Sequence, residues 1–120
     1  MNQKQLLDNL KKDSSLDDIQ KYIKKVIDIR GFGKEPVEQK LLLLLEEVGE
    51  LAKSIRKEKT NMSIDKNKIK NYAPVEEEIA DVFIVLTSIC NTLNINLYDC
   101  IIEKERINVE RTWENSNKNE

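Results

Sequence analysis

The sequence predicts an all-α fold, a four-helix bundle that dimerises. Only three of its 120 residues are glycine and two are proline, the residues least compatible with helices. Apolar side chains recur every three or four residues through four segments, as on an amphipathic helix, and no segment alternates like a strand. At one domain's length, the chain divides into an N-terminal extension (1–15), a helical domain (16–113) and a disordered tail (114–120).

The first two expected helices have recognisable ends. One runs from about 16 to 30, where Ser15 followed by Asp18 forms a capping-box pattern and a glycine-rich turn ends the segment. The second runs from 36 to about 56, because Pro36 suits the first turn of a helix. Its inward stripe is expected to be Leu41, Leu44, Leu45, Val48, Leu51, Ala52 and Ile55.

The other two helices follow a polar, lysine-rich stretch, 57–73, which reads as a loop. The third covers about 74–93, with an apolar face of Ile79, Val82, Phe83, Leu86, Ile89, Cys90 and Leu93. The fourth covers about 97–113, after a turn in which Asn96 and Asp99 are spaced as a helix cap.

Composition narrows the function classes. A formal net charge of −2 gives no broad basic surface, so we expect neither nucleic-acid nor membrane binding. No apolar run approaches the length of a membrane span, and the N-terminus does not resemble a signal peptide, so we expect a cytoplasmic protein. Cys90 and Cys100 read as small buried apolar groups rather than a disulfide framework.

Acidic residues border the apolar face on two helices. The second helix carries Glu46, Glu47 and Glu50, and the third carries Glu78 and Asp81. Carboxylates that converge beside a core need protonation, basic partners or a divalent cation. With no histidine in the chain, oxygen ligands select Mg²⁺, Mn²⁺ or Ca²⁺, and Mg²⁺ commonly shares its ligands with phosphates. The alternative is that these are ordinary solvated helix carboxylates.

Lys104, Asn108 and Arg111 are spaced to share one face of the fourth helix. Two cations and an amide can hold phosphate oxygens, arginine through its fork and lysine as a point charge. Cations near a helix C-terminus also complement its dipole, which is the alternative explanation.

In combination, these stretches resemble the MazG-like nucleotide pyrophosphohydrolases. The stretches are LLLLLEEVGELAKSIRK and EEEIADVFIVLTSICNTLNINLYDCIIEKERINVERTW, and the family pattern is E-E-x-x-E, a variable loop, E-x-x-D, then K-x-x-x-N-x-x-R. The resemblance implies the all-α NTP pyrophosphatase fold, assembled as a dimer or a dimer of dimers. It also implies hydrolysis of (d)NTPs to the monophosphate and pyrophosphate with Mg²⁺.

The resemblance also implies roles by position. The metal ligands would be Glu47, Glu50, Glu78 and Asp81, with Glu46 as a further or supporting ligand. Either Glu46 or Glu47 would be the general base. Lys104, Asn108 and Arg111 would hold the triphosphate or the sugar. Phe32 would stack on the base, or else plug the end of its helix.

Other readings stay open. The same fold could act on dUTP, a damaged nucleotide or phosphoribosyl-ATP, because the chain has few aromatic residues and Lys57 stands where one relative has tryptophan. A non-catalytic helical protein for dimerisation or partner binding is a further possibility. A di-iron bundle normally uses Glu-x-x-His pairs, which this chain lacks. The leucine run 41–45, apolar beyond one stripe, favours a dimer.

Overall fold

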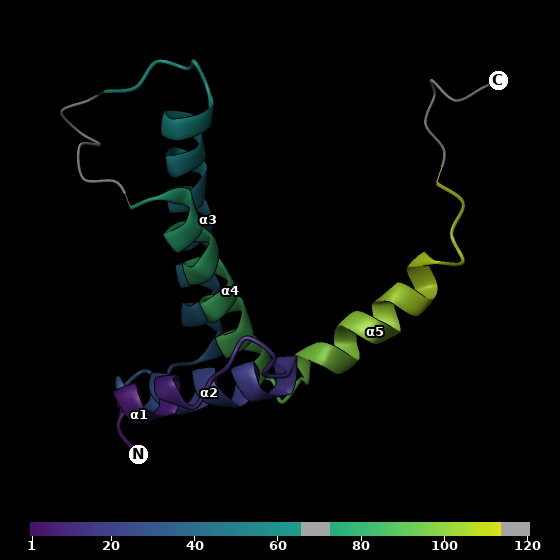
Figure 1. Ribbon diagram of the computed structural model, residues 1–120. Helices are drawn as coiled ribbons and strands as arrows, with labels where there is room; N and C mark the ends of the chain where they lie inside the picture. Colours follow the sequence, from purple (N-terminus) through teal and green to yellow (C-terminus); the bar gives the residue numbers. More distant parts are fainter. Residues whose placement is uncertain (66–72, 114–120) are drawn as a thin grey trace.

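The computed structural model describes residues 1–65 and 73–113, and every element in them is a helix. The helices are α1 (Gln3–Asp8), α2 (Leu16–Ile29), α3 (Val37–Lys59), α4 (Val75–Thr92) and α5 (Leu97–Asn108) (Figure 1). The all-α class is therefore confirmed, and a short helix, α1, is added within the expected N-terminal extension. The expected disordered tail lies outside the described residues.

Local sequence signals set both ends of α2. Ser15 Oγ accepts from the Asp18 amide at 3.0 Å, while Asp18 Oδ2 accepts from the Ser15 amide at 3.1 Å, so the expected capping box is confirmed. At the other end Gly31 adopts φ +88°, and the Phe32 amide donates to the Ile27 carbonyl at 3.0 Å. This left-handed turn closes the helix and turns the chain toward α3.

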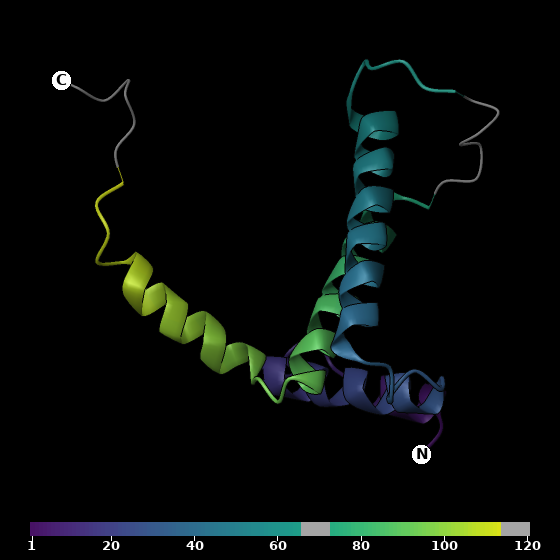
Figure 2. The same ribbon diagram turned by 180° about the vertical axis from the view of Figure 1, so that it is seen from behind.

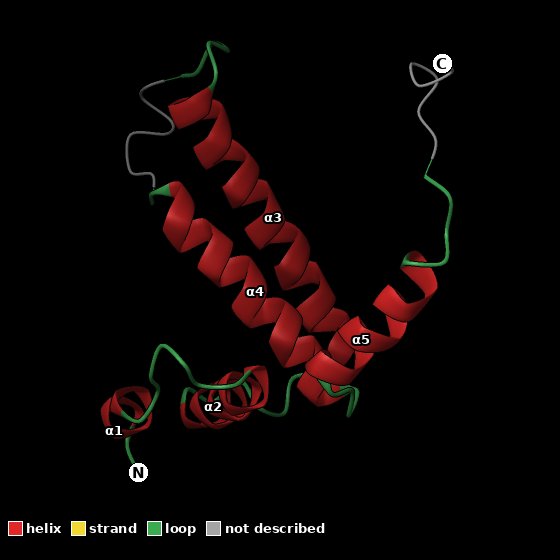
Figure 3. Ribbon diagram, turned by 45° about the vertical axis from the view of Figure 1, so that its right-hand side comes forward, coloured by secondary structure: helices red, strands yellow, loops and turns green. Residues whose placement is uncertain are grey.

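Helices α3 and α4 lie side by side and antiparallel, and they form the long arm of the molecule (Figures 1, 2 and 3). Lys40 Nζ donates to Ser88 Oγ at 2.9 Å at one end of the pair. Ser54 Oγ donates to the Ala73 carbonyl at 2.6 Å at the other. These two contacts fix the register, so the middle of α3 faces the first half of α4.

The ends of this pair differ slightly from expectation. Pro36 and Pro74 are N-caps rather than first helical residues. Helix α3 continues to Lys59, three residues beyond the expected end, and its last turn is basic, which complements the negative end of the helix dipole.

The expected inward stripe of α3 is partly wrong for the single chain. Leu44 and Leu51 are half-buried as expected, whereas Leu41, Leu45 and Val48 are 52%, 61% and 45% exposed. The face toward α4 carries Leu44 and Leu51 together with Lys40, Glu47 and Ser54. On α4, Phe83 is likewise exposed, while Cys90 is buried as expected. The reason is that α3 is apolar on more than one side, and α4 covers only one of them.

Helix α2 crosses the base of the α3–α4 pair (Figures 1 and 2). Its Ile23 and Val26 are 2% and 1% exposed, and with Cys90 and Leu97 they are the buried apolar residues of the described chain. The small core therefore sits where α2, α4 and the start of α5 meet. Cys90 and Cys100 are free thiols, and Cys100 is exposed, contrary to expectation.

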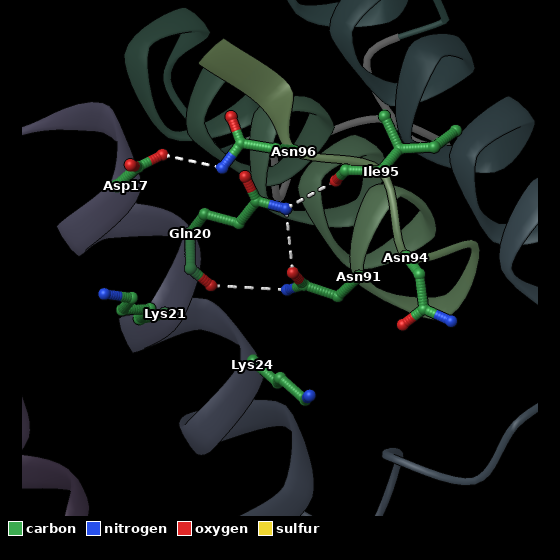
Figure 4. Close-up of a pocket in the computed structure, with 8 residues that line it drawn as sticks. All are labelled: Asp17, Gln20, Lys21, Lys24, Asn91, Asn94, Ile95 and Asn96. Carbon is green, nitrogen blue, oxygen red and sulfur yellow. Dashed lines mark hydrogen bonds between the residues drawn. The ribbon is translucent and has the colours of Figure 1, made fainter. Parts of the chain in front are cut away.

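Gln20 of α2 fixes the elbow between α4 and α5 (Figure 4). Its Nε2 donates to Asn91 Oδ1 at 2.9 Å and to the Ile95 carbonyl at 2.8 Å. Its Oε1 accepts from the Leu97 amide at 2.8 Å, one of the amides at the start of α5 that have no partner within the helix. A single buried amide thus joins three elements.

Helix α5 leaves this elbow, bent by 97° from α4, and extends away from the α3–α4 pair (Figures 1 and 2). It packs on α2 and ends at Asn108, five residues before the expected end at 113. Asn96 accepts from the Asp99 amide at 2.9 Å, which confirms the expected cap. Within residues 1–65 and 73–113, no single helix combines the length and apolar character of a membrane span.

Candidate metal and nucleotide site

Three predicted ligands meet where α3 faces α4. Carboxylate oxygens of Glu47, Glu78 and Asp81 all lie within 4.8 Å of one another. The α3–α4 register explains this, because it places Glu47 opposite the turn of α4 that carries the E-x-x-D pair. Two acidic pairs that are distant in sequence therefore become one cluster.

Burial differs across the cluster. Glu78 is 6% exposed, Glu47 is half-buried and Asp81 is exposed. Glu78 Oε2 is buried without a hydrogen-bond partner among the described residues. A buried carboxylate oxygen without a donor is strongly unfavourable, and a bound cation is one way to satisfy it.

The cluster changes the acidity of two of its members. Burial raises the pKa of Glu47 above its ordinary value, and the negative charges of Asp81 and Glu78 raise it further, with smaller contributions from Glu50 and Glu46. Burial also raises the pKa of Glu78, followed by the charge of Asp81. Both shifts arise from crowded negative charge in partly desolvated surroundings, which a divalent cation would relieve.

The remaining carboxylates lie at the edge of the cluster. Glu50 is outside the three-member group and pairs with Lys53, with 3.6 Å between Oε1 and Nζ. Its charge nevertheless raises the pKa of both Glu47 and Glu78, so it adds to the negative field of the cluster. Glu46 is exposed, and of the four carboxylate charges that raise the pKa of Glu47 its effect is the smallest. All ligand atoms here are carboxylate oxygens, which suits Mg²⁺ or Mn²⁺.

The proposed phosphate-binding residues are not brought to this cluster within one chain. Lys104 and Asn108 lie on α5, which points away from α3 and α4 (Figure 1). Arg111 lies beyond the end of α5, so the three do not share one helix face as expected. Successive i to i+3 bonds at Glu110 and Arg111 tighten the chain into turns after Asn108.

Local contacts hold two of these side chains. Asn108 Nδ2 donates to Glu105, and the Arg111 guanidinium lies 5.8 Å from the centre of the Trp113 ring. Trp113 Nε1 in turn donates to the Asn108 carbonyl at 3.4 Å. The end of α5 and the residues that follow it thus present an amide, a cation and an aromatic ring together, and one chain leaves most of this segment exposed.

Phe32 lies in the turn between α2 and α3 and is 49% exposed. The acidic motif of α3 begins at Glu46, nine residues after Val37 and about 14 Å further along the helix axis. Within one chain, Phe32 therefore lies before the N-terminal end of α3, whereas the acidic motif is in the middle of this helix. The role of Phe32 in base stacking stays a prediction.

Sequence reasoning missed the buried polar residues on the α3–α4 contact. Lys40 and Ser54 are 5% and 0% exposed, and both make hydrogen bonds across to α4 or to the residue before its cap. The available signal was their spacing, because both fall on the same helical stripe as Glu47. A lysine in the first turn of a helix is usually solvated, so the stripe was not recognised.

Comparison with known proteins agrees with this arrangement. The model of the MazG nucleotide pyrophosphohydrolase domain matches residues 36–106, more than half of the chain. The crystal structure of YpjD from Bacillus subtilis, a candidate pyrophosphatase, aligns with a TM-score of 0.61 at 27% identity. The match covers 85% of this chain and 100% of YpjD. No curated protein sequence matches significantly.

The family match spans the carboxylate cluster and most of α5. MazG domains generally depend on a divalent metal, and the cluster of Glu47, Glu78 and Asp81 is a group of ligands suited to one. The chain therefore belongs to the MazG nucleotide pyrophosphohydrolase family and is a hydrolase that acts on nucleotide pyrophosphate bonds.

Proposed function

We propose that the protein hydrolyses (d)NTPs to the monophosphate and pyrophosphate with Mg²⁺ bound to Glu47, Glu50, Glu78 and Asp81. The observation that carries this proposal is the convergence of three carboxylates within 4.8 Å, one of which has a buried oxygen without a partner. When bound, the cation would neutralise phosphate charge and lower the pKa of a coordinated water.

The residues of the chain supply the remaining chemistry. Glu47 or Glu46 takes the proton of the water that attacks the α-phosphorus, and pyrophosphate leaves. Glu47 is a candidate because it belongs to the carboxylate cluster that would hold the cation and its coordinated water. Glu46 remains the other candidate, because it is exposed and lies outside the three-member cluster.

Substrate binding in this proposal involves a second copy of the chain. Lys104, Asn108 and Arg111 extend away from the carboxylates of their own chain, while the exposed leucines of α3 require a cover. In a homodimer or a dimer of dimers, these residues hold the triphosphate or sugar, and the leucines become buried. Size-exclusion chromatography with light scattering would contradict this assembly if the protein were monomeric at micromolar concentration.

A substrate panel tests the reaction. The purified protein is incubated with the eight common NTPs and dNTPs and with dUTP, with and without Mg²⁺, and the products are resolved by ³¹P NMR. Monophosphate and pyrophosphate that form only with Mg²⁺ are the expected products. Diphosphate with orthophosphate would mean that a different phosphorus is attacked.

The same-fold alternatives use dUTP, a damaged nucleotide or phosphoribosyl-ATP, and the ranking within an extended panel separates them. The non-catalytic alternative predicts no turnover and no effect of Mg²⁺ on thermal stability. In contrast, a metal bound by the folded state raises the melting temperature by mass action. A cytoplasmic location stays a prediction from the sequence.

A further inference from the structure

Lys40 is a buried cation that pairs with no carboxylate among residues 1–65 and 73–113. Its side chain is on α3, and the residue is 5% exposed. Within the described part of the chain, the only hydrogen bond of its Nζ is the one to Ser88 Oγ, and no carboxylate oxygen lies within 4.0 Å. An ammonium group has three protons to donate, so two are left without a protein acceptor.

Lys40 and its partner Ser88 both line a cavity of about 60 Å³ at the junction of three helices. The lining comes from α2, the turn after it, α3 and α4: Lys24, Ile27, Asp28, Gly33, Lys40, Ser88, Asn91 and Thr92. A single water needs only about 10–15 Å³ of cavity volume, so the cavity has room for a polyatomic ion. It is separate from the carboxylate cluster, since Lys40 precedes Glu47 by two helical turns, about 10 Å.

The polar groups of the lining favour a negative ligand. Lys40 and Lys24 supply two positive charges against one negative charge, Asp28. Ser88 Oγ accepts from Lys40, which leaves its own proton available for donation. Asn91 is already engaged, because its Oδ1 accepts from Gln20 Nε2 and its Nδ2 donates to the Gln20 carbonyl.

Asp28 does not neutralise the charge of Lys40. Its carboxylate lies over Gly33, where an added Cβ would fall 1.7 Å from Asp28 Oδ1. The residue is exposed, and its oxygens are more than 4.0 Å from Lys40 Nζ. The burial of an unpaired charge is strongly unfavourable, so a negative ion bound beside Lys40 would stabilise the fold.

We propose that this cavity is a binding site for a small inorganic oxyanion of the size of phosphate, held by Lys40 Nζ and Ser88 Oγ with Lys24 at its edge. The site is independent of the proposed hydrolysis, because its residues lie outside the carboxylate cluster. The anion would join α2 to the α3–α4 pair and so stabilise the base of the fold.

The test uses the full-length protein after removal of divalent metal, with inorganic phosphate as the probe. Phosphate is titrated by calorimetry and by thermal melting, and sodium chloride of equal ionic strength provides the comparison. We expect phosphate to raise the melting temperature more than chloride does. The Lys40→Met variant should bind phosphate about ten-fold more weakly or worse, since hydrogen bonds to charged groups are among the stronger ones.

Two further variants make the result decisive. Lys25→Met is the matched control, because Lys25 is an exposed lysine of α2 outside the cavity lining, and it should leave phosphate affinity unchanged. Lys24→Met removes the exposed second cation and should weaken binding by a few fold, even if Lys40→Met fails to fold. If the wild type and Lys40→Met bind phosphate with equal affinity, the proposal is overturned. If Lys40→Met does not fold, equal affinity of the wild type and Lys24→Met overturns it. So does a wild-type response to phosphate no larger than the response to chloride.

Discussion

Glu78 and Glu47 couple the stability of the metal-free protein to pH. Both have a raised pKa in the folded chain, against an ordinary value of 4.5. Between the unfolded and folded pKa values, the folded chain holds more protons than the unfolded chain. The contribution of these two groups to stability is therefore fully present below about pH 4.5 and is lost as the pH rises through their folded pKa values.

The first prediction follows from that sign. In metal-free buffer, the melting temperature of the wild type should fall as the pH rises above 4.5, and Glu78→Gln should reduce this fall. Glu76→Gln is the control, because Glu76 is exposed on the same helix and its charge is not among those that raise the pKa of Glu78. A pH slope that is the same in both variants would contradict the assignment. Saturating Mg²⁺ should restore wild-type stability at neutral pH but stabilise Glu78→Gln less.

The second prediction concerns Asp81 in catalysis. Asp81→Asn keeps the shape of the side chain and removes one charge of the cluster, so we expect hydrolysis to fall below detection with the helical circular dichroism unchanged. Glu76→Gln, in the exposed first turn of α4, should retain full activity. The substitution Glu50→Gln tests whether Glu50 coordinates the ion despite its pairing with Lys53. Full turnover by both Asp81→Asn and Glu50→Gln at saturating Mg²⁺ would refute the proposed ligand set.

At the scale of the helices, local signals explain what the sequence could predict. Ser15 with Asp18, and Asn96 with Asp99, each cap their own helix through contacts only three residues apart. Such caps can be recognised without knowledge of the fold. The acidic pairs could also be recognised, because each borders the face of a helix that packs on its neighbour.

Contacts between distant segments explain what could not be predicted. The direction of α5 depends on Gln20, whose partners Asn91 and Leu97 lie 71 and 77 residues away in sequence. The buried face of α3 depends on which side α4 covers, and a helix with apolar residues nearly all round does not specify that. The position of Lys104 and Arg111 relative to the carboxylates therefore could not be predicted from sequence patterns within single helices.

The third prediction tests the elbow itself. Gln20→Met removes three side-chain hydrogen bonds and leaves the Leu97 amide, Asn91 Oδ1 and the Ile95 carbonyl without this partner. The free energy of unfolding should fall by about 2–4 kcal/mol, since buried polar groups left unpaired cost roughly 1–3 kcal/mol each and some recover water. Urea unfolding followed by circular dichroism measures it. Gln39→Met, at an exposed position on α3, should change stability by no more than about 0.5 kcal/mol, and an equal effect of the two would exclude this role for Gln20.

The whole molecule is more extended than its length requires. Its radius of gyration is 18.1 Å, whereas a compact chain of this length has about 14 Å. Exposed apolar side chains lie along α3, α4 and α5, among them Leu42 at 64%, Ile79 at 54% and Ile107 at 54%. Surfaces of this kind normally become buried in an assembly. A second copy of the chain would bury the exposed apolar side chains of α3 and α4. It would also allow α5 to lie beside the carboxylate cluster of the partner.

The fourth prediction separates sites made within one chain from sites shared between two. Asp81→Asn inactivates the carboxylate side, and Lys104→Ala combined with Arg111→Ala inactivates the phosphate side. If α5 serves the partner's cluster, a mixed dimer of the two variants has one site with both sides intact and one with both defective. Random assembly at equal amounts then restores about one quarter of wild-type activity per chain, because half of the dimers are mixed. Co-refolding of the two inactive proteins, followed by the NTP assay, measures this recovery. If α5 instead serves its own chain, every site in the mixed dimer keeps one defect, and the mixture stays as inactive as its components.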